Sequence, residues 1–448
     1  MEKTNSAMQF SQSVPLLAEC DVLVIGGGPA GVCAAIAAAR QGIRVMLIEK
    51  SGFCGGMATA AYVGPILGLY HWASGKRIMG GIGLELLEAM EKAGGAILKT
   101  EGMLVPFDPE IMKLVCDQML VEAGVIIRYH TSAVAVVQSE QRLTHVVVST
   151  GTGLSYIKAQ VYIDCSGDGF VAAQMGVPFV MGNGIDGQTM PMTTVFRLGN
   201  VETSEIVDSE NPKVGYVATE IRNLLNNALQ KGEIPLFGGP WIMRGSTLRD
   251  HQAFVNMVRQ WGDSTNSQSI TQCEIQGRQD MFSLMEYLNN NEPALAKAFI
   301  IDSGGVIGVR DSRHFTCKRR LSLKDCINHV QHPDSIGLGG HILDIHEGKG
   351  SSDQQRETLP YYEIPLRALL PTVVPNLILA GRTLDADYEV FASARVMGTC
   401  MVMGQGAGTA AAWAVLNNDD VENINLTWLA DILDSDGVPR RAVMERSK

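Results

Sequence analysis

The chain has 448 residues, of which 46% are hydrophobic and 19% charged, and its formal net charge at pH 7 is -11. These values are typical of a compact globular protein with enough residues for two or three cores, and they exclude an intrinsically disordered chain. The acidic balance disfavours nucleic acid or an anionic membrane surface as the main partner.

Neither a membrane span nor a secretory signal stands out. No apolar run reaches the ~18–20 residues that a transmembrane helix needs, and the first residues lack the charged start and apolar core of a signal peptide. We therefore expect a cytoplasmic protein without membrane insertion, in which residues 1–18 form a flexible leader. Nine cysteines without a C-x-x-C pair disfavour zinc and iron–sulfur centres and suit a reducing compartment.

Residues 21–50 follow the order strand, glycine turn, helix, strand and acid. The apolar run at 21–25 predicts a strand buried on both faces. Gly26, Gly28 and Gly31 then fit G-x-G-x-x-G, in which the glycines permit a tight turn, approach to a pyrophosphate and close helix–strand packing. The alternative is a plain strand–helix turn without a ligand.

The second half of this unit supplies the helix and the acid. Residues 30–41 are rich in alanine and predict a helix whose N-terminus faces the phosphates. The next strand, "RVMLIE", ends on Glu49, where a carboxylate accepts hydrogen bonds from ribose hydroxyls and would repel a 2′-phosphate. The complete order predicts one dinucleotide-binding unit.

The loop "KSGFCGGMAT" follows directly and contains the pair Gly55-Gly56. Two adjacent glycines favour a second close approach of the backbone to a long cofactor, although an ordinary flexible loop is the alternative. Cys54 has no resolving partner nearby, so we interpret it as a packed small residue.

The remaining chain divides into segments that differ in predicted secondary structure and in polarity. A helix and strands are predicted over 108–137, strands that run into turns over 159–169 and 376–382, and a tightly packed small-residue helix over 391–415. Residues 203–349 are more polar and lack the alternation of strands and helices, which indicates an inserted domain. We expect a leader at 1–18, a cofactor-binding domain at 19–200 and 351–448, and a substrate domain at 201–350.

These motifs resemble the FAD-dependent oxidoreductases of the glutathione-reductase-like superfamily. The resemblance rests on G-x-G-x-x-G, E-K, "GGMAT", "IDCSGDG", "IPLRALLP", "NLILAGR" and "SARVMGTC", and it covers about 19–64, 108–197 and 305–414. It implies an α/β fold with a Rossmann-like FAD-binding domain and an inserted α+β substrate domain. Two departures are Gly406, where the family usually has alanine, and "DYEVF" at 387–391, where it often has histidine.

The resemblance also implies the cofactor site. The residues that would hold FAD are Gly26, Gly28, Pro29, Ala30, Gly31, Glu49 and Lys50 at the ADP half; Gly55, Gly56, Met57, Ala58 and Thr59 along the pyrophosphate and ribityl chain; Val134 at the adenine; Ser166, Gly167, Asp168, Gly381 and Arg382 close to the cofactor; and Arg395, Gly404 and Ala407 near the isoalloxazine. No histidine lies in the 50–59 loop, so we expect non-covalent FAD. No second dinucleotide fingerprint exists for NAD(P)H, so electrons enter from the substrate or a transient partner.

Two stretches carry candidate catalytic residues. "GVIGVRDSRHFT" holds Arg310 and Arg313, which suit bidentate recognition of a carboxylate or, alternatively, form surface ion pairs. "GGHILDIHEGKG" holds Asp344 and His346, which would share one face of a strand, with His341 on the other. The pair suits a general base with its supporting carboxylate, while a buried structural hydrogen bond is the alternative. Because His341 faces away, we expect no metal.

The leading hypothesis is a flavoprotein dehydrogenase that oxidises a small polar hydroxy or amino substrate, either anionic or uncharged, by hydride transfer to flavin N5. One alternative is a flavin-dependent reductase of an activated double bond. Another is a non-enzymatic flavin-binding protein that interacts with RNA or other partners. The sequence leaves open the substrate, the electron acceptor and whether the chain forms a homo-oligomer.

Overall fold

The computed structural model describes residues 11–98, 104–202, 219–244, 247–346, 354–355 and 357–442. Its centre is a five-stranded parallel sheet with the strand order β19-β8-β2-β3-β4. These strands are Leu377–Leu379, Val161–Asp164, Val22–Ile25, Val45–Ile48 and Ile126–Arg128. The fold is therefore mixed α/β, and the C-terminal part of the chain supplies the edge strand β19 beside β8.

Both faces of this sheet are buried because its central strands are apolar at every position. Val22 and Val24 of β2 pack into the core beneath the helices, whereas Leu23 and Ile25 pack into the core on the opposite face. The helices are α1 (Pro29–Ala39), α3 (Gly81–Lys92), α4 (Pro109–Glu122) and α10 (Met397–Asn417).

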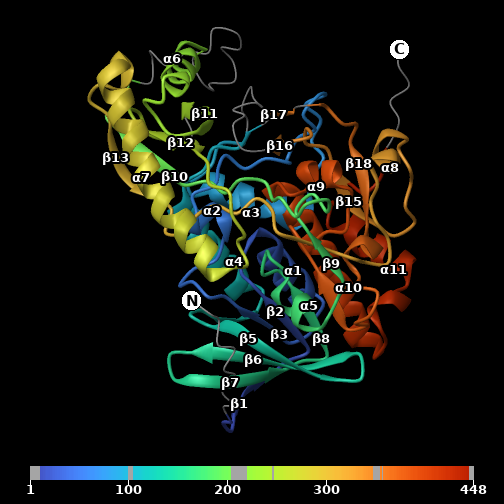
Figure 1. Cartoon of the computed structure of the whole chain (residues 1–448). Helices are drawn as coiled ribbons and strands as arrows, with labels where there is room; N and C mark the ends of the chain where they lie inside the picture. Colours follow the sequence, from blue (N-terminus) through green and yellow to red (C-terminus); the bar gives the residue numbers. More distant parts are fainter. Residues whose placement is uncertain are drawn as a thin grey trace, which may run out of the picture.

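An antiparallel sheet covers the opposite face and lies at the bottom of Figure 1. It consists of β5 (Ser132–Ser139), β6 (Arg142–Thr150) and β7 (Gly153–Lys158), with β1 (Leu16–Glu19) added parallel to β7. Residues 16–18 of the expected leader therefore form a strand, since their backbone pairs with β7.

The first helix begins at Pro29 and ends at Ala39, slightly before the predicted limits of 30–41. Proline is favourable as the first helical residue because its missing N–H would have no partner there. Beyond the helix, Gly42 has a φ of +82°, which only glycine adopts without strain.

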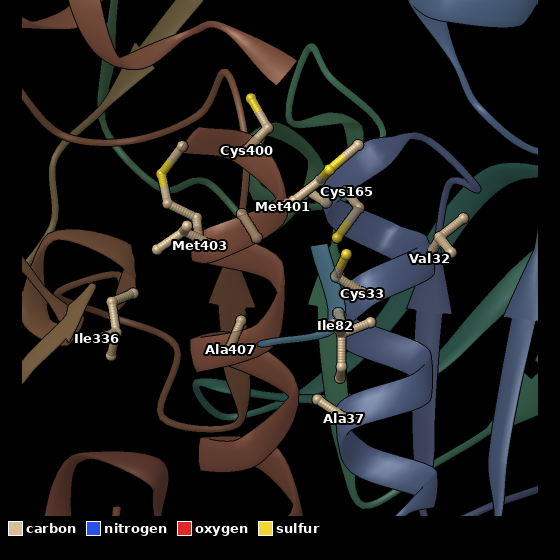
Figure 2. Close-up of a cluster of buried hydrophobic side chains, with 14 of the residues drawn as sticks. Val32, Cys33, Ala37, Ile82, Cys165, Ile336, Cys400, Met401, Met403 and Ala407 are labelled. Atoms are coloured by element: carbon tan, nitrogen blue, oxygen red, sulfur yellow. The ribbon is translucent and has the colours of Figure 1, made fainter. Parts of the chain in front are cut away.

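The predicted small-residue helix is in fact two helices, α9 (Tyr388–Ala394) and α10. Its expected close contact with another backbone is confirmed. A Cβ on Gly404 would lie 2.0 Å from the carbonyl oxygen of Ala30, and one on Gly408 would lie 2.1 Å from that of Ala34. Figure 2 shows α1 and α10 side by side, with Cys33 and Ala37 on the side of α1 that faces α10.

A separate antiparallel sheet has the order β11-β12-β10-β13. Its strands are Phe237–Arg244, Ala253–Val258, Val195–Gly199 and Phe299–Ser303. The long helix α7 (Ser267–Asn291), at the left of Figure 1, shares a core with this sheet. In the described part of the chain, the parallel sheet takes no strand from residues 201–350; the domain limits stay a prediction.

Shorter elements complete the described fold. They are α2 (Met57–Ala60), α5 (Phe170–Gln174), α6 (Thr219–Gln230), α8 (Leu323–Ile327), α11 (Leu426–Ser435), β9 (Phe179–Met181), β14 (Arg313–Phe315), β15 (Ser335–Gly339), β16 (Ile345–His346), β17 (Gln354–Gln355), β18 (Tyr362–Pro365) and three short 3₁₀ turns at Pro293–Leu295, Leu366–Leu369 and Val421–Asn423. Among the helices that the structure describes, none is both long and apolar enough to cross a bilayer. All nine cysteines are buried free thiols.

Candidate cofactor and active site

The glycine turn between β2 and α1 contains one open position. A Cβ on Gly31 would lie 1.9 Å from the carbonyl oxygen of Gly26, so this glycine is required for helix–strand packing. Gly28 differs, because the nearest atom to an added Cβ is 3.9 Å away. Gly28 is also the N-cap of α1. A negatively charged group can therefore approach the helix N-terminus at this point.

The Gly55-Gly56 loop lies directly against this turn. The backbone N–H of Gly55 donates to the carbonyl oxygen of Gly27 at 2.8 Å. A Cβ on Gly56 would lie 2.8 Å from the Cα of Gly28. The second glycine pair thus lines the same open position as the first motif, which favours the cofactor interpretation over an ordinary loop.

Glu49 lies at the end of β3 and is 8% exposed. Its carboxylate oxygens accept hydrogen bonds from the backbone N–H groups of Gly27 and Ser51, both at 2.8 Å. The acid therefore ties the glycine turn to the following loop, a role that the sequence did not predict. It also holds negative charge where the sequence analysis places a ribose.

Val134 is the extra residue of a bulge in β5. Its neighbours Ala133 and Ala135 pair with the consecutive residues Val148 and Val147 of β6. A bulge leaves the backbone groups of the extra residue outside the ladder. This geometry suits the predicted backbone contact of Val134 with an adenine.

The turn after β8 brings two guanidinium groups to Asp168. Arg382 Nη2 donates to the Asp168 carboxylate at 3.2 Å, and Arg313 Nη1 donates to the Asp168 carbonyl oxygen at 3.1 Å. Arg382 Nη1 and Arg313 Nε are buried without a hydrogen-bond partner. Both arginines therefore keep donors available for a bound group.

Ser166 in the same turn has a structural partner that the sequence analysis missed. Its hydroxyl donates to Asp164 at 2.6 Å, and the other Asp164 oxygen accepts from the N–H groups of Val171 and Ala172 in α5. Burial raises the pKa of Asp164, although these hydrogen bonds oppose the shift. Asp164 thus fixes the turn that carries Gly167 and Asp168.

The segment 304–310 runs along the cofactor loop. The N–H of Val306 donates to Ala60 O at 3.3 Å, and the N–H of Val309 contacts the Met57 sulfur at 3.4 Å. Arg310, the next residue, is therefore held beside the loop that follows Gly56. Its guanidinium group lies beside that of Arg259, which directly follows β12, and both groups donate to Thr193.

Arg310 and Arg259 share the same two neutral acceptors. The Nη1 atoms of both lie 2.6 Å from Thr193 Oγ1. Asn256 Oδ1 accepts from Arg259 Nη1 at 2.7 Å and from Arg310 Nη2 at 3.3 Å. Neither arginine forms an ion pair with a carboxylate among the described residues. The buried guanidinium group of Arg259 and the partly buried one of Arg310 thus lie side by side, hydrogen-bonded to neutral oxygens, with Asp344 as the nearby negative charge.

Burial lowers the pKa of Arg259 to about 10, with Arg395 acting in the same direction. Burial, together with the charges of Arg259 and Arg395, lowers the pKa of Arg310 well below its ordinary value. Like charges repel, and the repulsion is stronger at a buried site than in water. An anion bound here would relieve this repulsion.

Asp344, His346 and Arg395 complete the cluster. Arg395 Nη2 donates to the Asp344 carboxylate at 2.7 Å, and His346 Nε2 lies 3.3 Å from the same oxygen. Burial would raise the pKa of Asp344, but the contact with His346 and the charge of Arg395 hold it well below its usual range. Burial lowers the pKa of His346 to about 3; Asp344 opposes this shift, while Arg310 and Arg259 add to it. The imidazole is therefore neutral at neutral pH.

The structure places Arg310, Asp344 and His346 in one cluster and adds Arg395 from the cofactor list; their role at the flavin stays a prediction. Arg313 lies apart from them, because it bonds to Asp168 and stacks over Phe179. Among the described residues 340–346, only Ile345 and His346 form a strand, and Asp344 precedes it. The argument that Asp344 and His346 share one face of a strand therefore assumed too early a start for the strand. The Asp344–His346 contact nevertheless forms.

Arg259 is the site residue that the sequence analysis missed. It follows β12 in "NMVRQWG", which matches no motif. A Cβ on Gly238 would lie 2.4 Å from Arg259 Nε, so Gly238 makes room for its guanidinium. The described residues contain no group of three or more His, Cys, Asp or Glu side chains suited to a metal ion.

Gly404 and Ala407 lie in the interior of α10 and are buried. Gly404 contacts α1 at Ala30, immediately after the open position at Gly28. Its visible role is to hold α1 in place, and its direct contact with a cofactor stays a prediction. At the start of the same helix, Thr399 Oγ1 is buried without a partner.

A family described as FAD dependent oxidoreductase matches residues 21–433 of the chain. A curated relative, 4-oxocyclohex-2-ene-1-carboxylate 5-dehydrogenase from Sinomonas cyclohexanicum, is 44% identical over 59 residues, which are 13% of this chain and 9% of the relative. The chain thus spans less than a tenth of that relative's length.

Two solved structures are similar over most of the chain. A geranylgeranyl bacteriochlorophyll reductase-like protein from Thermoplasma acidophilum is 16% identical, with a TM-score of 0.44, and the match covers 94% of this chain and 82% of the other. A flavin-dependent brominase is 14% identical, with a TM-score of 0.45, and the match covers 94% and 84%. These values carry no conclusion about activity.

The cofactor is FAD, and the site fits it. An added Cβ at Gly28 would meet only the Cα of Gly56, at 3.9 Å, so the backbone there is open to a ligand. The buried nitrogen atoms without partners in Arg382, Arg395 and Arg313 offer donors to a polar ligand.

Proposed function

Because the chain belongs to the FAD-dependent oxidoreductase family, we propose that it is a dehydrogenase of a small, polar, anionic hydroxy or amino compound. We also propose that its fold is the glutathione-reductase-like form, with residues 201–350 as an inserted substrate domain. FAD, when bound, supplies the acceptor for a hydride at flavin N5. The remaining chemistry falls to the side chains of the chain itself.

The observation that carries this proposal is the contact between Asp344 and His346 beside the buried arginines. The Asp344 carboxylate lies 3.3 Å from His346 Nε2 and orients the imidazole ring. A hydrogen bond from Arg395 stabilises the ionised form of this carboxylate. An oriented neutral imidazole can accept the proton of a hydroxyl or amino group as the hydride leaves the adjacent carbon. In the free protein the two buried arginines keep His346 a weak base. A bound substrate anion would offset their charge and make His346 a stronger base.

The loops around Gly28 and Gly56 would hold the pyrophosphate, and Glu49 the ribose. Arg382 and Arg313 would bind along the cofactor from the Asp168 turn. The dehydrogenase named among the relatives acts, by its name, on a carboxylate. Its similarity to 59 residues supports an oxidation reaction without specifying the substrate here.

A reductase of an activated double bond is the second candidate. The observation in its favour is Arg310, whose pKa is lowered well below its ordinary value by burial and the neighbouring Arg259. An arginine of lowered pKa can release a proton to a carbanion more readily. In that reaction the electrons would come from a donor that reduces the flavin before the substrate binds.

Anaerobic mixing of the holoenzyme with hydroxy acids, amino acids and enoates tests both candidates. The dehydrogenase predicts flavin bleaching by a hydroxy or amino compound. The reductase predicts re-oxidation of reduced flavin by an enoate. Flavin that responds to no compound of either kind would contradict both.

A variant separates catalysis from folding. His346→Ala should retain FAD and its melting temperature but reduce flavin ~10²–10⁴-fold more slowly, the usual cost of removing a positioned base. His145→Ala, on the antiparallel sheet of the cofactor half, is the matched control and should react normally. If His346→Ala melts at a lower temperature while its reduction rate per folded molecule is unchanged, the residue is structural and the proposal fails.

A further inference from the structure

We propose that Arg259 and Arg310 form one binding site for a carboxylate group of the substrate, which makes the substrate a carboxylic acid. The inference rests on the proposed function, in which an anionic compound is oxidised. It adds Arg259, a residue that no motif indicates. Arg259 directly follows β12 of the antiparallel sheet β11-β12-β10-β13, which is separate from the parallel sheet.

The first argument is the way in which the two guanidinium groups are held. Thr193 Oγ1 accepts from both Nη1 atoms at 2.6 Å and donates its own hydrogen to Val258 O at 3.0 Å. Its hydrogen-bonding capacity is then complete. Asn256 Oδ1 also accepts from both arginines. These neutral groups fix the position of the two arginines without cancelling their charge.

The second argument is an orphaned donor. Arg259 is 4% exposed, and its Nη2 is buried without a hydrogen-bond partner. A buried charged donor without a partner is costly, so a structure retains one where a ligand supplies the acceptor. Two guanidinium groups side by side offer this ligand several N–H groups in fixed directions, which matches the two oxygens of a carboxylate.

The third argument is charge balance. Arg259, Arg310 and Arg395 supply three positive charges, and Asp344, paired with Arg395, supplies one negative charge. The excess positive charge attracts an anion, and the phosphate titration below distinguishes a carboxylate site from a general anion site. The position also suits the reaction, since Arg310 and Arg259 act on the pKa of His346. An acid bound by its carboxylate would therefore present its neighbouring atoms near the imidazole.

The experiment measures binding to the oxidised holoenzyme and not turnover. Acetate, propionate, succinate, benzoate and inorganic phosphate are titrated, together with acetamide, propionamide, succinamide and benzamide as uncharged counterparts. The readout is the perturbation of the flavin absorption spectrum. The variants are Arg259→Gln, Arg259→Lys, Arg310→Gln and the control Arg278→Gln, which removes an exposed arginine from α7.

At least one carboxylate should bind more tightly than its amide, and each glutamine variant should weaken that carboxylate about thirtyfold or more. Arg259→Lys keeps the positive charge but loses the paired N–H donors of the guanidinium group, so it should retain part of the preference for carboxylate over amide. Arg278→Gln should retain all of that preference. If Arg259→Gln fails to fold, Arg259→Lys and Arg310→Gln decide the matter.

Three results would overturn the inference: no carboxylate preferred over its amide, a preference unchanged in the folded Arg259 and Arg310 variants, or phosphate bound most tightly. Carboxylate binding through both arginines, without flavin reduction by any hydroxy or amino acid, would refute the proposed dehydrogenase and leave the binding site standing. The reverse pattern would refute only the binding site.

Discussion

Gly28 and Gly31 lie in one turn, yet the structure predicts opposite effects for a side chain at each. At Gly28 an added Cβ has its nearest neighbour at 3.9 Å, and the backbone angles of -70° and -178° suit any residue. At Gly31 an added Cβ would lie 1.9 Å from a backbone oxygen, whereas real Cβ contacts stay above 3.0 Å. Gly28→Val should therefore fold normally without FAD, and the smaller change Gly31→Ala should damage the fold.

The magnitudes follow from these contacts. A valine at Gly28 occupies the space of the pyrophosphate and removes at least two hydrogen bonds to a charged group. Each contributes about 1.5–3 kcal/mol, so FAD binding should weaken roughly 100-fold or more. Gly31→Ala overpacks a rigid contact, and since a backbone oxygen cannot rotate away, the cost should be about 3 kcal/mol, the upper end for overpacking.

The assay measures FAD content by absorbance and thermal unfolding of the apoproteins. Apo forms are needed because bound FAD would itself stabilise the wild type. We expect apo Gly28→Val to melt with apo wild type, and apo Gly31→Ala to melt several degrees lower. Gly151→Ala, at a position with no atom within 4 Å, is the neutral control. Full FAD occupancy in Gly28→Val, or an unchanged melting temperature in Gly31→Ala, would refute the reasoning.

Three further predictions concern the cofactor and acid stability. Glu49→Ala should weaken FAD binding and loosen the adjoining loop while the fold persists, as measured by FAD titration and melting. Acid or heat should release FAD, and flavin that stays on the denatured polypeptide would show that the expectation of non-covalent binding was wrong. Burial alone would raise the pKa of Asp334, but hydrogen bonds and charge from Arg367 lower it below the ordinary value. This pair should contribute stability above the unfolded-state pKa of ~3.9 and lose it as the pH falls through the folded pKa. Asp334→Asn should therefore be less stable than wild type at pH 7 and less sensitive to acid; an identical acid transition in both proteins would contradict this.

The cofactor-binding residues could be predicted from the sequence because the motifs that mark them are local. The first glycine motif, the second glycine pair and Glu49 all lie within 40 residues of one another, and each reports a backbone requirement that only a few residue types meet. The small residues at Gly404 and Gly408 also predicted close backbone packing. They did not identify α1 as the partner, because the pattern of one helix says nothing about what lies opposite.

The candidate catalytic residues were harder to predict because they come from segments that are distant in the sequence. Arg259 carries no signal, since a single arginine after a strand has no periodicity or spacing that distinguishes it from a surface residue. Arg310 and Arg313 appeared equivalent in sequence, but β14 begins at Arg313 and directs it toward Asp168. Tertiary placement alone separates their roles.

The contact of Gly404 and Gly408 with α1 has a consequence for synthesis on the ribosome. The edge strand β19 and the helix α10 follow α1 by more than 330 residues in the chain, so they are synthesised well after it. Until then the apolar surface of α1 that α10 covers has no partner, and such exposed surfaces promote aggregation. FAD capture should therefore wait until α10 has been synthesised, and a ribosome-stalled chain that ends before α10 should depend on chaperones that shield α1.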